Sequence, residues 1–235
     1  TVEQLAAAID EDTAAVVILA GFDGQRRPDT ASVVKIAHGK GVPVLVDGAY
    51  GIPPKENLWR YTRELGCDAF ITSGGKAIRG PQSTGLVLGK PAIIEGCRFH
   101  SSPNLRVGRG MKVGKEEFAG IYRAMRLFLD DDDEARAIAL AKQIVRIRES
   151  LDQLPGVTVN AEENPPRVTI DFNPTVIALT AQAIEKQMLD GHPSILLMAR
   201  GNKITVRASL LEGGEEELVG RRLREVLSGG LAKSG

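Results

Sequence analysis

The first half of the chain alternates short apolar runs with amphipathic segments. Apolar runs occupy residues 14–20, 42–46, 67–72 and 85–88. Such short continuous runs are typical of strands that are covered on both faces. Helical patterns cover residues 2–9, before the first run, and residues 29–39 and 56–65, between later runs. Asp29 or Thr30 can cap the second of these helices, and Gly66 ends the third. Strands and helices that alternate in this way predict an α/β fold with a mainly parallel, doubly wound sheet.

The second half has a different pattern. An amphipathic pattern covers residues 116–129, and a second one begins in the acidic run 130–134. We interpret this run as the start of a helix, where the helix dipole favours acidic residues, and not as a metal site. Two alternating segments, GVTVN and RVTIDF, predict half-buried strands, and a hairpin is expected to turn at Gly201 and Asn202. Further helices are expected over residues 176–189 and 214–228. We therefore expect a large domain over residues 1–112 and a C-terminal α+β domain with linking helices over residues 113–235.

Composition narrows the class of protein. The 235 residues are 43% hydrophobic and 26% charged, which is an ordinary globular balance. The 30 basic and 30 acidic residues cancel, so no net charge attracts the chain to nucleic acid or to an anionic membrane. Two cysteines without metal-ligand spacing are typical of a reducing compartment. With no apolar stretch near 18 residues, these features predict a soluble, cytoplasmic protein without a metal site.

Candidate chemistry follows two successive strands of the predicted sheet. Asp47 ends the second apolar run, and the segment Ser73-Gly-Gly-Lys76 follows the third. Ligands of parallel sheets bind beyond the carboxyl ends of strands, so these residues can share one site.

Several interpretations of Lys76 compete. It can be an ordinary turn lysine that faces water, and the bare tetrapeptide also fits the S-x-x-K motif of penicillin-recognising enzymes. Two glycines argue against the helical turn that S-x-x-K needs, and the chain has no K-T-G partner. The later GLVLGK resembles a phosphate-binding loop, but it is one residue short and Pro91 replaces the required Ser or Thr.

A third chemical interpretation is a lysine that forms a Schiff base with pyridoxal phosphate. That cofactor needs an amine for its aldehyde, a carboxylate that keeps its pyridine nitrogen protonated, and donors around its phosphate. Lys76, Asp47 and the Ser73 hydroxyl occur in the order and placement that such a site requires. Asp47 alone would be read as a turn cap, because Asp-Gly is common turn chemistry.

Two sequence blocks, SGGKAIRGPQ and GRGMKVGKEE, carry a resemblance to a known family. Together with the segment from residue 42, they resemble the branch of fold-type-I pyridoxal-phosphate enzymes related to selenocysteine synthase, closest to the D-glucosaminate-6-phosphate ammonia-lyase type. The resemblance implies pyridoxal 5′-phosphate as cofactor, held by Lys76 as the Schiff-base lysine, Asp47 as the pyridinium partner, Ser73 and Gly75. It implies roles in binding an anionic substrate, or in subunit contacts, for Arg79, Arg109 and Lys112. It also implies at least a homodimer.

Relatives in this family carry three more strands and a phosphate-binding helix start before the segment that opens here. We therefore expect the chain to be a partial large domain of the PLP-transferase fold type I with its C-terminal domain, from a longer enzyme. The expected activity is elimination of the β-hydroxyl of an amino acid or phosphorylated amino sugar acid, which yields a 2-keto acid and ammonia.

Three alternatives stay open at this point. The first is seryl-tRNA selenium transfer, which the zero net charge disfavours because tRNA attracts basic surfaces. The second is aminotransfer, which begins with the same removal of a proton. The third is a non-catalytic subunit that retains the fold, against which the presence of both Lys76 and Asp47 counts.

Overall fold

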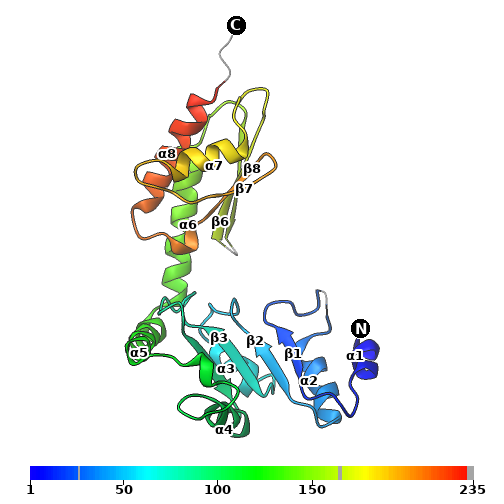
Figure 1. Ribbon diagram of the computed structural model, residues 1–235. Helices are drawn as coiled ribbons and strands as arrows, with labels where there is room; N and C mark the ends of the chain where they lie inside the picture. The colour runs from blue at the N-terminus through cyan, green and yellow to red at the C-terminus, as the bar shows by residue number, and fades with distance from the viewer. Residues whose placement is uncertain (26, 164–165, 232–235) are drawn as a thin grey trace. The chain divides into compact units, whose positions relative to one another are not determined.

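The computed structural model describes residues 1–25, 27–163 and 166–231, and these form two compact units (Figure 1). The N-terminal unit spans Thr1–Asp133 and the C-terminal unit spans Glu134–Gly235. None of the helices in the described part of the chain is both long enough and apolar enough to cross a membrane.

The N-terminal unit is built on a four-stranded sheet. Its strands are β1 (Val16–Leu19), β2 (Val44–Asp47), β3 (Ala69–Ser73) and β4 (Gly85–Gly89), in the spatial order β1-β2-β3-β4. The first three strands are parallel, and β4 is antiparallel to β3. This mixed but mostly parallel sheet confirms the predicted α/β class.

Helices connect and flank these strands. They are α1 (Val2–Ala8), α2 (Thr30–Gly39), α3 (Asn57–Arg63), α4 (Pro91–His100), η1 (Arg109–Met111) and α5 (Lys115–Asp130). Asp29 caps α2 as predicted, because its carboxylate accepts a hydrogen bond from the backbone N–H of Ser32 at 2.9 Å. The sequence interpretation missed α4, although a proline at its first position is a known start signal.

The core of this unit lies on one face of the sheet. Side chains of Val33 and Ala37 from α2, and of Leu58 and Tyr61 from α3, pack in one cluster with Ile18, Val44, Val46 and Phe70 from the strands. The Tyr61 ring stacks on the Phe70 ring with centroids 5.3 Å apart. Because β1, β2 and β3 follow one another in one direction, right-handed crossovers place both connecting helices on this same face.

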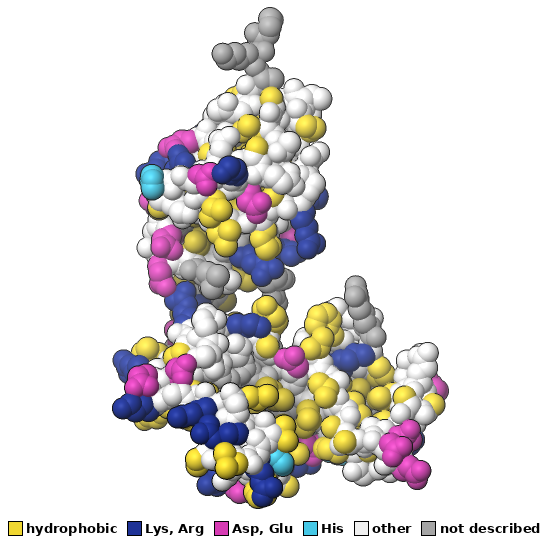
Figure 2. All heavy atoms as spheres, in the orientation of Figure 1, with side chains coloured by type: hydrophobic (Ala, Val, Ile, Leu, Met, Phe, Trp, Pro, Cys, Tyr) yellow, Lys and Arg dark blue, Asp and Glu magenta, His cyan; other side chains and the backbone are white. Residues whose placement is uncertain are grey.

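The opposite face of β1 is open. Val17 and Leu19 alternate with the buried Ile18 and are 65% and 53% exposed, and Figure 2 shows hydrophobic side chains at the surface of this unit. This differs from the expectation of a strand buried on both faces. An apolar run identifies a strand that is suited to burial on two sides, but only neighbouring elements decide whether both sides are covered.

Helix α5 packs within the N-terminal unit. Its side chains Ile121 and Phe128 are buried in the same cluster as the strands. The compact unit therefore extends to Asp133, beyond the residue 112 at which the sequence pattern changes. The 1–112 and 113–235 division of the domains stays a prediction.

The C-terminal unit is an antiparallel sheet with helices, as the pattern predicts. Its elements are α6 (Asp133–Ser150), β5 (Val157–Glu163), β6 (Pro166–Phe172), α7 (Ala181–Leu189), β7 (Met198–Arg200), β8 (Lys203–Arg207), η2 (Ala208–Leu210) and α8 (Glu215–Gly229). The strand order is β5-β6-β8-β7. The hairpin turn at Gly201 and Asn202 is confirmed, since Arg200 pairs with Lys203. Helix α7 begins five residues later than predicted because the Thr180 side chain caps it.

Candidate active site

Asp47 and Ser73 are the last residues of two neighbouring parallel strands. Asp47 ends β2 and is in register with Ile71 on β3, so Ser73 lies two residues further along the same edge. The loop after β2 is fixed to β3, since the N–H of Gly48 donates to the Ile71 carbonyl at 2.7 Å and the Thr72 hydroxyl donates to the Gly48 carbonyl at 3.2 Å. The segments that follow the two strands are thereby held side by side.

The turn that carries Lys76 is closed by its own hydrogen bonds. The N–H of Gly74 donates to the Thr84 carbonyl at 2.9 Å, and the N–H of Gly80 donates to the Gly74 carbonyl at 2.7 Å. The Gln82 amide donates to the Gly75 carbonyl at 3.1 Å. The backbone of this turn is therefore a fixed support for the lysine.

Two glycines are required because the turn is tightly packed. A Cβ atom added to Gly74 would lie 2.1 Å from the Thr84 hydroxyl oxygen, and one added to Gly75 would lie 2.7 Å from the Gln82 Cα. Both distances are far below van der Waals contact. The glycines before Lys76 thus let the two sides of the turn, residues 74–75 and 82–84, approach each other closely.

A further contact fixes the turn to α5. The Ser83 hydroxyl donates to the carboxylate of Glu117, which also accepts the N–H of Gly114 at the start of that helix. The hydrogen bond from Ser83, and then the one from Gly114, lower the pKa of Glu117. Ser83, the residue after the block SGGKAIRGPQ, therefore contacts Glu117 at the end of the block GRGMKVGKEE.

Lys76 lies on an aromatic ring. Its Nζ is 3.5 Å from the centroid of the Tyr50 ring, a cation–π contact, and Tyr50 is itself 83% exposed. Within the described ranges, no carboxylate pairs with this amine. The sequence analysis missed Tyr50, although its position three residues after Asp47, in the same strand-end loop, is a signal that could have found it.

Asp47 is an exposed carboxylate at the strand end. Its Oδ1 accepts a hydrogen bond from the N–H of Ala49 at 3.0 Å, which is the turn cap that Asp-Gly predicts. In the part of the chain that the structure describes, no lysine or arginine pairs with it. Its other oxygen is available to a ligand.

The predicted basic residues lie in two places. Arg79 lies in the turn that carries Lys76 and has a left-handed backbone conformation, with φ of 59°. Its backbone N–H donates to the Lys76 carbonyl at 2.9 Å. Arg109 is in η1, and Lys112 follows it as an exposed residue. Among the described residues, no hydrogen bond or ion pair joins Arg109 or Lys112 to Lys76 or Asp47. The Nε of Arg109 is buried without a described hydrogen-bond partner.

These residues fit the cofactor that the sequence predicts. Among the described residues, the Lys76 amine has no acidic partner and the Asp47 carboxylate no basic partner. Asp47 ends β2, Lys76 follows β3, and Tyr50 of the loop after β2 contacts Lys76. Ser73 is partly buried at the end of β3, and it lies between Asp47 and Lys76 in the sequence. Pyridoxal phosphate requires such an amine and acid at opposite ends of one ring.

Comparison with known proteins gives an independent result. Residues 1–108 match the family "Aminotransferase class-V". The chain is 30% identical over 204 residues to 5′-C-glycyluridine monooxygenase-decarboxylase from Streptomyces sp., which covers 83% of this chain and 49% of that protein. A second curated relative, a pyridoxal phosphate-dependent protein of Methanothermobacter thermautotrophicus, is 37% identical over 89 residues, covering 36% of this chain and 23% of the relative.

Among solved structures, D-glucosaminate-6-phosphate ammonia-lyase has a similar fold. The TM-score is 0.74 at 24% sequence identity, and the match covers 98% of this chain and 62% of that one. The chain spans about half the length of the longer-matching curated relative. Residues 1–108 thus match the class-V aminotransferase family, the whole chain shares the fold of the solved ammonia-lyase, and these matches imply pyridoxal 5′-phosphate as the cofactor.

Proposed function

We propose that this chain forms part of a pyridoxal-phosphate-dependent lyase that removes the β-hydroxyl of an amino acid or amino sugar acid. The observation that carries the proposal is the Lys76 amine, which rests on the Tyr50 ring without an acidic partner in the described structure, beside a strand that ends in Asp47. The ring contact holds the amine in place without engaging it in an ion pair, which leaves it available to a carbonyl group.

The residues have distinct tasks in this proposal. When bound, pyridoxal phosphate supplies an aldehyde that bonds amines and a cationic ring that accepts electrons from a substrate carbon. Asp47 holds a proton at the ring nitrogen, and the Ser73 hydroxyl, with the backbone beside Gly75, binds the phosphate group. Tyr50 orients Lys76. The Lys76 amine would hold the aldehyde and, as a free amine, would take the proton from the substrate Cα as general base.

The elimination balances in atoms and electrons. The Cα–H bond breaks with its proton going to Lys76, and the Cβ–O bond breaks with its electron pair leaving on oxygen. The proton on Lys76 converts the departing hydroxide to water. Hydrolysis by one water molecule then separates ammonia from a 2-keto acid, so the sequence needs no external oxidant or reductant.

An anionic substrate suits the predicted basic residues. Arg79 lies in the same turn as Lys76, and Arg109 has a buried Nε that lacks a described acceptor. Guanidinium groups bind carboxylates and phosphates through paired hydrogen bonds. Arg79, Arg109 and Lys112 are therefore our proposed contacts to the carboxylate or phosphate of a sugar acid.

We further propose that the enzyme is at least a homodimer. The loop after α4 and the outer side of α5 expose the large apolar side chains of Leu105, Val107, Met111, Phe118 and Tyr122, the first two 88% exposed. Several large apolar side chains exposed within residues 105–122 suit a subunit interface, because their burial against a partner removes apolar surface from water. Replacement of both Val107 and Met111 by aspartate should shift the full-length enzyme toward monomer in light scattering, and an unchanged mass would contradict this surface.

The test of the proposal is covalent capture on Lys76. Full-length enzyme is loaded with pyridoxal phosphate and reduced with borohydride, and mass spectrometry should find the pyridoxyl group on the peptide that carries Lys76. Lys76→Ala should lose both the adduct and activity, while Lys115→Ala, which changes an exposed lysine at the start of α5, should keep both. Asp47→Asn should still bind cofactor and lose activity about a hundredfold or more. An adduct elsewhere, or activity in Lys76→Ala, would end the proposal.

A second candidate is oxygen-dependent decarboxylation, which the 30% identity to the Streptomyces monooxygenase-decarboxylase favours. The two reactions differ in what they consume and release. Lyase activity on a phosphorylated amino sugar acid releases ammonia without oxygen. Decarboxylation of a glycyl nucleoside consumes oxygen and releases carbon dioxide. Oxygen-electrode and ammonia assays on both substrate classes distinguish them, and selenium transfer or aminotransfer would show instead as dependence on seryl-tRNA or on a keto-acid acceptor.

A further inference from the structure

Helix α5 is bonded to both of the loops that carry the proposed site. Near its start, the carboxylate of Glu117 accepts the hydroxyl of Ser83, which lies in the turn of Lys76. Its end is bonded by Lys55, which lies in the loop between β2 and α3, five residues after Tyr50. The two loops follow the neighbouring strands β3 and β2. One helix therefore contacts the segment of the amine and the segment of the acid.

Lys55 closes the C-terminal end of α5. The last carbonyl groups of an α-helix have no partner within the helix and attract cations. The last turn of α5 contains no basic residue, and the Nζ of Lys55 supplies the donor, at 2.6 Å from the Asp131 carbonyl and 3.2 Å from the Leu129 carbonyl. The backbone N–H of Lys55 also donates to the Oδ2 of Asp133 at 2.7 Å. Three hydrogen bonds thus join this residue to the end of α5 and the residue that begins α6.

The segment 50–55 has little freedom to absorb a displacement. The Gly51 carbonyl accepts the side-chain amide of Asn57 at 2.7 Å, and Ile52 is buried in the core of the unit. Residues 53 and 54 are both proline, whose ring fixes φ. The tyrosine at the start of the segment is exposed, so this backbone places its ring and the packing around the ring does not.

The turn of Lys76 is packed on the same helix. A Cβ added to Gly74 or to Gly80 would lie 2.7 Å or 2.9 Å from the Cδ1 of Ile121, which shows how closely the turn approaches α5. The hydrogen bond from Ser83 to Glu117 adds a polar contact one turn before Ile121. The amine is thereby held from the first half of α5, and the loop after β2 is held from its end.

We propose that α5 is a spacer between the two loops and that Lys55 is a positioning residue of the proposed site. The helix has 16 residues and is a rod about 24 Å long. Through Lys55 it fixes where the Tyr50 ring lies relative to the Lys76 amine. This inference rests on the proposed function, in which the amine and the Asp47 carboxylate hold opposite ends of one ring.

The test uses the full 235-residue chain, ¹³C-labelled and free of cofactor, and observes the Cε–Hε signal of Lys76 by NMR. The ring current of an aromatic side chain moves protons above its face upfield, and the Lys76 Nζ lies 3.5 Å from the Tyr50 centroid. We expect this signal upfield of other lysines, with its assignment from Lys76→Arg, and Tyr50→Leu should abolish the shift. Lys55→Met should move the signal toward the other lysines, and Lys55→Arg, which keeps donors for the carbonyls, should restore it.

Lys40→Met is the matched control for Lys55→Met. The Nζ of Lys40 bonds the Ala6 and Ile9 carbonyls at 2.5 Å and 2.6 Å, so it closes the end of α1 in the same way in the same unit. Its removal should leave the Lys76 signal in place. Dispersed amide spectra check folding, and Lys55→Gln, which keeps one donor, serves as the second variant if Lys55→Met does not fold.

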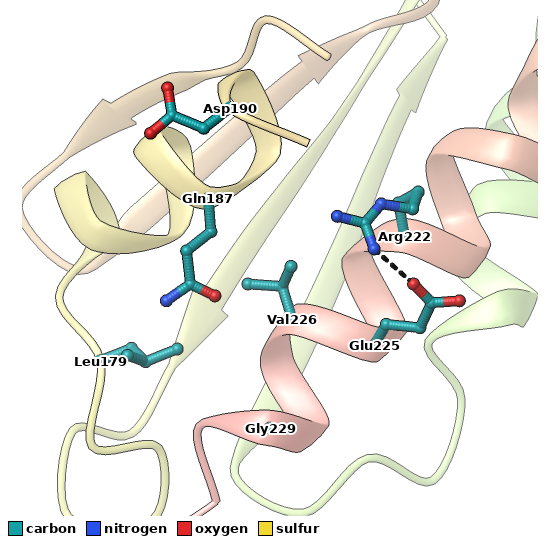
Figure 3. Close-up of a pocket in the computed structure, with 7 residues that line it drawn as sticks. All are labelled: Leu179, Gln187, Asp190, Arg222, Glu225, Val226 and Gly229. Carbon is teal, nitrogen blue, oxygen red and sulfur yellow. Dashed lines mark hydrogen bonds and ion pairs between the residues drawn. The ribbon is translucent and has the colours of Figure 1, made fainter. Parts of the chain in front are cut away.

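The other end of the spacer has its own variant. Glu117→Ala removes the acceptor of the Ser83 hydroxyl and should also move the Lys76 signal. Glu225→Ala is its control, because Glu225 pairs with Arg222 at 2.6 Å beside the cavity between α7 and α8 in the C-terminal unit (Figure 3). That change should leave the Lys76 signal in place.

The outcomes separate this inference from the proposed function. A Lys76 signal that stays upfield in folded Lys55→Met, or that moves equally in Lys40→Met, would overturn the positioning role. In loaded full-length enzyme, Lys55→Met should lower kcat about tenfold or more with KM within about twofold, because a misplaced catalytic group costs rate, and an unchanged kcat would also overturn it. Failed covalent capture on Lys76 would end the proposed function, and the cofactor-free comparison would still decide whether Lys55 places the Tyr50 ring.

Discussion

At the scale of single residues, the lysine turn depends on the absence of side chains before Lys76. Gly74 faces the Thr84 hydroxyl so closely that a methyl group would overlap it, and the Ile121 side chain from α5 lies 2.7 Å from the same position. The Thr84 hydroxyl itself donates to the Pro81 carbonyl at 2.6 Å, so it cannot move without losing that bond. The turn, the start of β4 and α5 therefore share one packed contact.

Gly74→Ala should lower the free energy of unfolding by about 1–3 kcal/mol, because overpacking displaces Thr84 or Ile121. Gly96→Ala is the matched control. Gly96 lies in α4 with no atom within 4 Å of an added Cβ, so alanine there should stabilise by up to about 1 kcal/mol through helix propensity. Urea unfolding measures both variants, and equal effects would contradict the packing argument.

The two cysteines differ in reactivity. Cys67 is fully buried before β3, and this burial raises the pKa of its thiol to about 11, whereas Cys97 is exposed on α4. Since the thiolate is the reactive form, a native chain at pH 8 should react with a thiol reagent at one site. Absorbance of the released chromophore measures this: Cys97→Ser should remove the fast reaction, and denaturant should expose a second thiol. A fast reaction in native Cys97→Ser would contradict the burial of Cys67.

At the scale of secondary-structure elements, one acidic side chain connects four of them. Asp68 precedes β3 and its side chain is nearly buried. Its Oδ2 accepts the backbone N–H of Val44 on β2 at 2.7 Å and contacts His38 of α2 at 2.8 Å, while its Oδ1 pairs with Lys90 before α4 at 2.6 Å. Burial by itself raises the pKa of this carboxyl, but the bonds from Lys90, His38 and Val44 outweigh it and hold the pKa below its ordinary value.

This lowered pKa predicts the pH dependence of stability. A carboxyl with a depressed folded pKa stabilises the fold above its unfolded pKa, and the contribution is lost as pH falls through the folded value. Asp68→Asn should therefore cost about 1–3 kcal/mol at pH 7, and the difference from the original protein should shrink below about pH 3.8. Urea unfolding at several pH values measures it, with the exposed Glu64→Gln as control. A difference that stays constant to pH 3 would contradict the assignment.

At the scale of the whole molecule, the described residues form two separate hydrophobic cores. One core joins the strands and helices of the N-terminal unit, and every residue of the other lies between Leu140 and Leu231. Ile144 and Ile147 of α6, and Leu151 just after this helix, are almost fully buried in this second core together with Leu223 and Leu227 of α8. The C-terminal unit thus buries its apolar side chains without residues from the first unit.

A fragment of residues 134–235 should fold by itself. Calorimetry should detect cooperative unfolding, with an enthalpy of about 60–80 kcal/mol for a domain of this size. In this fragment Ile147→Ala should cost about 2–5 kcal/mol, because a buried side chain leaves a cavity, while Val145→Ala, on the exposed side of α6, should cost much less. A fragment without a heat-absorption peak, or equal effects of the two changes, would show that the second core needs the first unit.

Much of the N-terminal fold was predictable because its signals are local. Apolar runs mark β1, β2 and β3, Asp29 marks the start of α2, and the residue types at two strand ends mark Asp47, Ser73 and Lys76 as one candidate site. Helix α4 and the start of α7 were placed less well. Their boundaries depend on a proline start and a threonine cap that compete with the apolar pattern.

The sequence by itself determined the order of strands and helices and the residue types at the strand ends, because period and capping act over a few neighbouring positions. Only the tertiary structure decided that Tyr50 lies under Lys76, that Ser83 binds Glu117 of α5, and that Asp68 joins four elements. These contacts join residues 22 to 34 positions apart. Packing across strands selects such partners, and no local pattern of apolar and polar residues contains that information.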